Sequence, residues 1–277
     1  MKDYIKIGVE KGYISFDQEM SRITYAHQNK SRSYSNPEEK VQAETFLRLI
    51  IDYKYPENRI KQFVSVPMGS ETKEADIVVY KDDMCLIPYI LVECKKQEVS
   101  EAEFQQAIGQ AYSYAFAMAG EVKYVWVTSG IKSDFFEVDQ TSNSRNQLPD
   151  IPQFGVSNVA SYKYVYEAKY LPGEAGKQRF FDLSVIDQSE LTRRFKQAHE
   201  ALWAGGQLNP SEAFDELDKL IFCKIWDERK PRKMGEPYDF QIITVPKEVE
   251  KNETKRRHIE NDNLYKRVMA LYEEGRK

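Results

Sequence analysis

The sequence predicts an α/β domain followed by an all-helical module. The α/β prediction depends on the order of signals between residues 36 and 128, which is one helix, three strands, one helix and one strand. The helical prediction depends on a change near residue 187, after which helix caps and helical periodicity replace β-rich runs. The 277 residues, of which 41% are hydrophobic, can form a full core. We therefore predict three parts: an N-terminal extension at 1–35, an αβββαβ core within 36–186, and helices over 187–277.

Each element of the first two parts has a local signal. The extension is polar with short apolar alternation, which predicts one or two short strands and then a loop. Asn36 suits a helix N-cap, Pro37 its first turn and Glu39 a capping box, so a helix is expected from there to about residue 53. Its apolar stripe has Glu39 near the centre, so this carboxylate is expected to point inward. Glu44 lies far round the helix and is expected to be exposed.

Three β-rich runs at 60–67, 75–80 and 87–95, joined by polar turns, predict a meander of antiparallel strands. A capping box formed by Ser100 and Glu103 begins a helix that is expected to end at Gly120, and residues 123–128 predict a further buried strand. The Tyr-rich segment 162–170 is compatible with a strand added at a sheet edge. Later helices are expected to end at 205–206, to begin at 209–210, and to cover about 248–274.

Composition and charge exclude several classes of protein. No run approaches the roughly 20 apolar residues that span a bilayer, and the start of the chain lacks a signal-peptide pattern, so we expect a cytoplasmic protein without a membrane partner. The three cysteines and three histidines are scattered, which leaves oxygen ligands for any metal. A net charge of −4 requires a DNA-binding chain to use local basic clusters. Such clusters occur at 95–96, 229–233 and 255–257, and for the last two a solvated face is the favoured interpretation.

Asp76, Glu93 and Lys95 have the residue types and spacing of a metal-dependent phosphodiesterase centre. Asp76 begins one predicted strand, while Glu93 and Lys95 lie two residues apart near the end of the next, so all three side chains can converge. Carboxylate oxygens suit Mg²⁺, and Mn²⁺ can substitute. The backbone carbonyl of Cys94 is a candidate ligand because its side chain faces away, and Glu39 is a candidate for a second ion. Without metal, at least one carboxylate pKa should be raised.

The triad in the form Asp…Glu-x-Lys resembles the PD-(D/E)xK nuclease superfamily. Gln110 and Tyr114 match the QxxxY element that accompanies the triad in the RecB-like and type I restriction branches, which implies catalytic roles for both. The segments NPEEKVQAETFLRLII, YPENRI, ADIVVY, YILVECKK, EAEFQQAIGQAYSYA and YVWVTSG resemble, in that order, the N-terminal endonuclease domain of type I restriction enzyme R subunits. The pattern departs from that family at Gln42, where Arg is common, and at Gln62, near where a Glu is common. The resemblance implies an Mg²⁺-dependent endonuclease acting on double-stranded DNA.

The segment from ALWAGGQLNPSEAFDELDKLIFCKIWDER to GEPYDFQ is similar to the N-terminal helical segment of N6-adenine methyltransferases. The chain has no glycine-rich cofactor loop, no NPPY-type tetrapeptide and no motor motifs, so neither methylation nor ATPase activity is expected. This combination implies a restriction–modification enzyme with methyltransferase and specificity domains or subunits as partners. The alternative is a catalytically inactive module that assembles such a complex or positions its DNA.

Overall fold

The computed structural model describes residues 2–118, 122–204 and 208–277, and these residues form two compact units. One unit contains residues 2–157 and the other residues 158–277, and each is described here by itself. The sequence predicts boundaries at 35/36 and 186/187. In the structure, residues 2–35 belong to the unit that contains the core, and residues 158–186 belong with the C-terminal helices.

A mixed sheet forms the centre of the unit at residues 2–157. Its strand order is β4-β5-β6-β7-β8-β9, and every neighbouring pair is antiparallel except β6 and β7, which are parallel. The parallel pair is possible because a helix crosses from one strand to the next. The strands are β4 Ile60–Met68, β5 Glu71–Tyr80, β6 Pro88–Cys94, β7 Tyr124–Thr128, β8 Ser133–Asp139 and β9 Ser144–Leu148.

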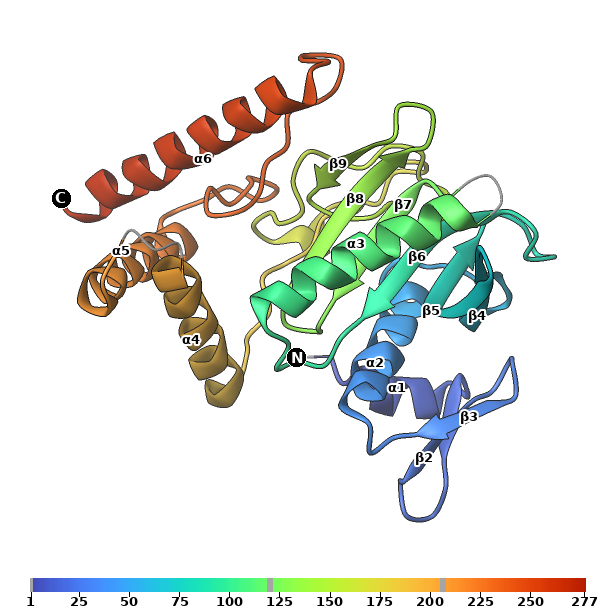
Figure 1. The fold of residues 1–277 in the computed structure, drawn as a ribbon. Helices are drawn as coiled ribbons and strands as arrows, with labels where there is room; N and C mark the ends of the chain where they lie inside the picture. The colour runs from blue at the N-terminus through green and yellow to red at the C-terminus, as the bar shows by residue number, and fades with distance from the viewer. Residues whose placement is uncertain (1, 119–121, 205–207) are drawn as a thin grey trace. The chain divides into compact units, whose positions relative to one another are not determined.

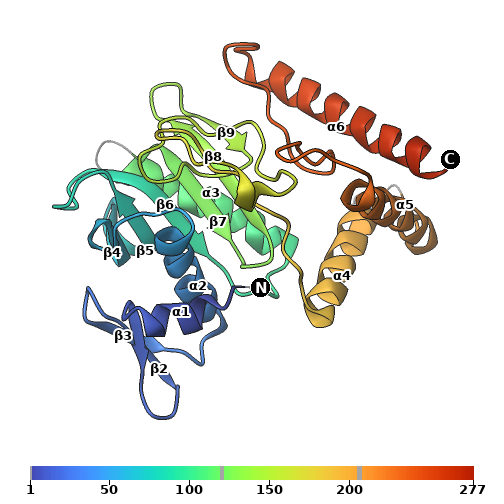
Figure 2. The ribbon, with the colours of Figure 1, turned by 180° about the vertical axis from the view of Figure 1, so that it is seen from behind.

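Two helices cover the two faces of this sheet (Figures 1 and 2). Helix α3, Glu101–Ala117, packs on the face that presents Leu91, Val125 and Val127. Because strand side chains alternate, Trp126 points to the other face, where Arg48 of α2, Pro37–Ile51, lies over its ring. Side chains of odd-numbered β6 residues, including Glu93, therefore lie on the α3 face.

The N-terminal extension is more ordered than predicted. It forms α1, Tyr4–Glu10, and a three-stranded antiparallel sheet of β1 Ile14–Phe16, β2 Arg22–Tyr25 and β3 Lys30–Ser33. Side chains of Gln28 and Lys30 donate hydrogen bonds to β4, at the edge of the larger sheet: Gln28 Nε2 to Gln62 Oε1 at 2.9 Å and Lys30 Nζ to the Gln62 carbonyl at 2.8 Å. This satisfies polar groups that an edge strand otherwise exposes.

The predicted order of the core, α-β-β-β-α-β, is confirmed as α2, β4, β5, β6, α3 and β7. The Asn36 cap and the Ser100–Glu103 capping box are also observed, but the capping box predicted for Asn36 and Glu39 is wrong, because Glu39 bonds to Tyr25 instead. The predicted helix ends at Gly120 and at Gly205-Gly206 lie outside the described residues. An edge strand at 162–170 is wrong: β8 and β9 extend the sheet, while Tyr164 and Val165 form only isolated bridges to Phe181 and Pro237 within the other unit.

The unit at residues 158–277 contains α4 Gln188–Ala204, α5 Pro210–Arg229 and α6 Glu253–Gly275. The predicted Asn209–Glu212 capping box begins α5, and α6 begins five residues later than expected, after an Asn252 cap. Across the part of the chain that the structure describes, no helix is long and apolar enough to cross a membrane.

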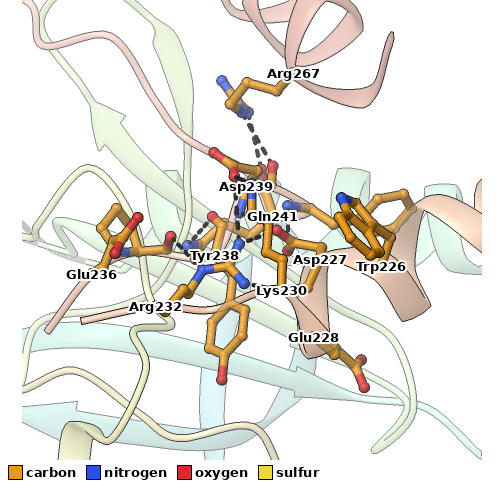
Figure 3. A network of polar contacts seen from close by, with 12 residues as sticks. Trp226, Asp227, Glu228, Lys230, Arg232, Glu236, Tyr238, Asp239, Gln241 and Arg267 are labelled. Carbon is orange, nitrogen blue, oxygen red and sulfur yellow. Dashed lines mark hydrogen bonds and ion pairs between the residues drawn. The ribbon is translucent and has the colours of Figure 1, made fainter. Parts of the chain in front are cut away.

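A buried polar network joins the end of α5 to the loop that follows it (Figure 3). Asp227 is 1% exposed, ion-pairs with Arg232, and accepts hydrogen bonds from the backbone N–H groups of Asp239 and Phe240 at 3.2 and 2.9 Å. Lys230 Nζ lies 2.7 Å from Asp239 Oδ2. Lys230 and Arg232 of the predicted basic cluster at 229–233 therefore hold this loop, and they do not form a solvated face.

Candidate active site

The strand register brings Asp76 and Glu93 together. Ile77 pairs with Val92 and Val78 with Leu91 in the antiparallel ladder of β5 and β6, and the next position of this register sets Asp76 opposite Glu93. Opposed residues of an antiparallel pair project to one face of the sheet, and Lys95, two residues after Glu93, projects to that same face. The predicted convergence of the triad on one spot is thus observed.

Hydrogen bonds fix each member of the triad. The backbone N–H of Cys94 donates to Asp76 Oδ2 at 2.6 Å, and Lys95 Nζ lies 2.8 Å from Glu93 Oε1. The Lys95 side chain is 22% exposed and that of Glu93 only 3%. The lysine therefore links a buried carboxylate to the open side of the site.

Burial raises the pKa values of the Asp76 and Glu93 carboxyl groups. Loss of solvation, followed by repulsion from Glu93, raises the pKa of Asp76 well above its ordinary value. Loss of solvation also raises the pKa of Glu93, although the neighbouring Lys95 ammonium opposes this. The raised pKa that the sequence predicts is therefore found at both groups, and removal of water contributes more to it than repulsion does.

A pocket of about 440 Å³ opens beside the triad. The segment directly after β6 contributes Lys95 and Lys96, and helix α3 contributes Gln110. The rest of the lining comes from the start of α2 and from α3 and the segment before it: Asn36, Pro37, Glu38, Val99, Glu103, Gln106 and Ala107. Amines, amides and carboxylates thus surround a space that is open to solvent and suited to a polar, anionic group.

The structure brings Gln110 to this pocket and connects it to Tyr114. Gln110 Nε2 donates to the Tyr114 hydroxyl oxygen at 2.8 Å, and Tyr114 is 5% exposed within the core under α3. The two residues are one helical turn apart, on the same side of α3. Tyr114 therefore orients the Gln110 amide and does not itself line the pocket.

Glu39 does not join the triad. It is buried as predicted, but Oε1 accepts a hydrogen bond from the hydroxyl of Tyr25 in β2, and Glu39 does not line the pocket. Glu38 does line it, and its charge acts on the pKa values of Asp76, Glu93 and Lys95. The apolar stripe of α2 points away from the pocket. Helical periodicity therefore identifies Glu39 as the buried carboxylate, but it does not identify Glu38 as the carboxylate that lines the pocket.

The Cys94 side chain faces α2, opposite the site, as predicted. It is 2% exposed, and burial raises the pKa of its thiol, which bonds to Thr45.

Gln42, where the family commonly has Arg, donates from Nε2 to the backbone carbonyl of Asp76 at 2.9 Å. Gln62, the other departure, is fully buried and bonds to Gln28. Gln42 therefore has a structural role beside the triad, and Gln62 has one where the N-terminal extension meets β4.

The donor set fits a hard divalent cation. Glu93 Oε2 is buried and has no hydrogen-bond partner, and a metal ion would satisfy it. Among the described residues, no three His, Cys, Asp or Glu side chains already converge closely enough to hold a metal ion. The Cys94 N–H and Lys95 occupy Asp76 Oδ2 and Glu93 Oε1, which leaves Glu93 Oε2 as the oxygen that a metal ion would bind.

Replacing Asp76 by Asn should stabilise the metal-free protein at neutral pH, since the amide keeps an acceptor for the Cys94 N–H and carries no buried charge. The direction of this change in stability follows from the linkage between proton binding and folding. A raised carboxyl pKa stabilises the fold at low pH, and this stabilisation is lost as pH rises through the raised value. Thermal unfolding in EDTA should therefore show Asp76→Asn with the higher Tm at pH 8. A shift of about 2 °C corresponds to roughly 1 kcal/mol in a domain of this size.

The two melting temperatures should converge near pH 4, close to the ordinary pKa of an aspartate, where both side chains are neutral. Asp134→Asn is a matched control, because burial also raises the pKa of Asp134, but the charges that act on Asp134 are those of Lys132 and Glu101 and not that of Glu93. A Tm for Asp76→Asn at or below that of the wild type at pH 8 would show that Asp76 is not a strained buried carboxylate.

Comparison with known proteins supports a restriction-enzyme relationship for part of the chain. The chain matches no curated protein. Residues 37–152 match a family model described as the N terminus of the type I restriction enzyme R protein. The matched segment includes α2, the whole of the larger sheet, α3, and every residue of the triad. This part of the chain is similar to the N-terminal domain of a type I restriction enzyme R protein.

Proposed function

We propose that the chain is the Mg²⁺-dependent endodeoxyribonuclease module of a restriction–modification enzyme and that its core is of the PD-(D/E)xK type. The observation that carries the proposal is the convergence of Asp76, Glu93 and Lys95 at the end of β6, beside an open pocket, with a buried Glu93 oxygen that has no partner. The match of residues 37–152 to a restriction-enzyme domain supports DNA as the substrate.

Asp76, Glu93 and the Cys94 carbonyl would hold the metal, and Glu38 replaces Glu39 as the carboxylate of α2 that completes the site. Oxygen donors of this kind are those that Mg²⁺ selects, and Mn²⁺ can take its place. The bound ion would supply Lewis-acid stabilisation of the phosphate and a lowered pKa for a bound water. Because the two buried carboxyl groups have raised pKa values, metal binding should release protons and strengthen with pH.

Lys95 and Gln110 act on the attacking water and on the phosphate. The Lys95 ammonium, held by Glu93 at 2.8 Å, is placed to hydrogen-bond a water in the pocket and to balance charge on the phosphate. Gln110, oriented by Tyr114, is a neutral donor and acceptor on the opposite wall. Lys96, exposed at the same rim, supplies a cation for a neighbouring phosphate.

The proposed partners are double-stranded DNA and other subunits or domains of a restriction–modification enzyme. The family of the matched segment works with such partners, which supports this proposal. The unit at residues 158–277 would be the part that meets a methyltransferase, as its resemblance to a methyltransferase helical segment implies. Its helices leave large apolar side chains exposed, including Trp203, Phe214 and Ile225, which is typical of a helical unit that packs against another protein.

The test is metal-dependent cleavage of double-stranded DNA by the wild type and by Glu93→Gln, which keeps the size of the side chain and removes its charge. We expect conversion of supercoiled plasmid in Mg²⁺ or Mn²⁺, none in EDTA, and none with Glu93→Gln. Equal conversion by the two proteins would place the activity elsewhere. No conversion by either, together with no Mn²⁺ binding, would favour the inactive module that assembles a complex.

A further inference from the structure

We infer that Tyr25 and Glu39 form a positioning pair, through which the N-terminal extension holds the first turn of α2 so that Glu38 faces the pocket. The inference rests on the proposed function, because Glu38 matters to chemistry only if the pocket binds a metal. Tyr25 and Glu39 do not line the pocket themselves. Their effect would be exerted entirely through the orientation of the helix start.

The pair is buried, and the Tyr25 ring packs against α2 and β4. Tyr25 is 1% exposed and Glu39 is 5% exposed, and the Tyr25 hydroxyl donates to Glu39 Oε1. The Tyr25 ring makes edge contacts with Phe46 of α2 and Phe63 of β4, with centroid distances of 5.3 and 6.0 Å. The tyrosine therefore cannot swing away without disturbing the aromatic cluster, and the carboxylate that it binds is held in one place.

A second anchor acts one turn later on the same helix. Gln42 Nε2 donates to the Asp76 carbonyl at 2.9 Å, and residues three apart lie on one side of a helix. Glu39 thus ties α2 to β2, while Gln42 ties it to the strand that carries the triad. Two fixed points on one side restrain both rotation and sliding of the helix start.

This restraint decides where Glu38 points. Glu38 precedes Glu39 and lies about 100° away around the helix axis, so fixing Glu39 on the inner side directs Glu38 towards Lys95 and the pocket. The same turn begins at Asn36, whose side chain caps the Glu38 N–H at 3.0 Å. A small rotation of α2 would move the Glu38 carboxylate by more than an ångström, enough to weaken a metal site.

The experiment measures Mn²⁺ affinity by electron paramagnetic resonance in the full chain. Tyr25→Phe removes only the hydroxyl, and we expect the Mn²⁺ Kd to rise about 10- to 100-fold, the effect of losing a partner that orients a ligand. Glu39→Gln keeps an oxygen that can accept from Tyr25, so it should stay close to the wild type. A large loss with Glu39→Gln would instead make Glu39 a ligand and overturn the inference.

Tyr55→Phe is the matched control. Tyr55 is 3% exposed and its hydroxyl donates to the Pro152 carbonyl at 2.9 Å, so the same buried bond is lost away from the pocket. If Tyr55→Phe weakens Mn²⁺ binding as much as Tyr25→Phe does, the effect is general destabilisation and the inference fails. If Tyr25 acts through Glu38, adding Tyr25→Phe to Glu38→Gln should change Kd by less than about twofold, because neighbouring effects are then not additive.

Hydrogen exchange separates this inference from the proposed function. Tyr25→Phe should speed amide exchange in residues 37–46, and Tyr55→Phe should not, whether or not the protein binds metal or cleaves DNA. Absence of Mn²⁺ binding in the wild type would overturn the function. Unchanged exchange at 37–46 in Tyr25→Phe would overturn the positioning pair.

Discussion

Replacing Lys95 by Ala is expected to lower the rate of DNA cleavage at saturating DNA by about 10²- to 10⁴-fold, the usual range for loss of a positioned proton-transfer group. Lys95 Nζ is the amine that Glu93 holds at 2.8 Å in the pocket. In the proposed mechanism, its removal takes away the hydrogen-bond donor to the attacking water and leaves the carboxylates intact. The loss should therefore appear in the rate and not in metal binding.

Mn²⁺ affinity should in fact be retained or strengthened in Lys95→Ala, because the ammonium now competes for Glu93 Oε1. Lys96→Ala is the matched control: Lys96 is the next residue and lines the same pocket, but the structure gives it no contact with the triad. We expect Lys96→Ala to weaken DNA binding at high salt and to keep the rate at saturating DNA. A rate for Lys95→Ala within about tenfold of the wild type would remove Lys95 from the mechanism.

Replacing Arg232 by Met is expected to destabilise the unit at residues 158–277 by about 3–5 kcal/mol, since it leaves the Asp227 carboxylate buried without its cation. The side chains of Arg232 and Asp227 are 1% and 2% exposed, so water cannot replace the lost partner. Asp227 also accepts from the backbone of the following loop, and this loop should loosen with it. Amide exchange of α5 and the loop at 230–241 measures the effect.

Arg229→Met is the control, because Arg229 is exposed on the last turn of the same helix and a surface substitution there should cost no more than about 0.5 kcal/mol. The double variant Asp227→Leu with Arg232→Met should recover part of the loss, since it removes the buried charge as well as its partner. Equal stability of Arg232→Met and the wild type would show that the network contributes nothing to the fold of this unit.

The core and the triad followed from the sequence because each has a local signal. Helix caps at Asn36, Ser100 and Asn209 specify where chains of helical hydrogen bonds begin. Apolar β-rich runs predict adjacent strands, and once Asp76 and Glu93 sit on neighbouring antiparallel strands their convergence depends only on register. The order of the core elements was therefore predictable.

Other features depend on contacts between distant residues, which local patterns do not encode. The extension was predicted as one or two short strands and a loop, and its local pattern does not show that Gln28 and Lys30 bond to β4 and Tyr25 to α2. Glu38 and Glu39 are neighbouring carboxylates of one type, and the sequence does not show that Tyr25 bonds to Glu39 while Glu38 lines the pocket. Residues 162–170 have strand-forming composition, but their hydrogen-bond partners come from the C-terminal unit. Tertiary partners thus overrode local propensity.

The most direct test of the metal-centre claim is a Mn²⁺ titration of the wild type and of Asp76→Ala by electron paramagnetic resonance, at pH 7.5 and again at pH 5.5. We predict saturable binding by the wild type that weakens at the lower pH, because protons compete for the buried carboxylates, and loss of this binding in Asp76→Ala. Binding of equal strength in both proteins, or no binding by the wild type, would contradict a metal centre at Asp76 and Glu93.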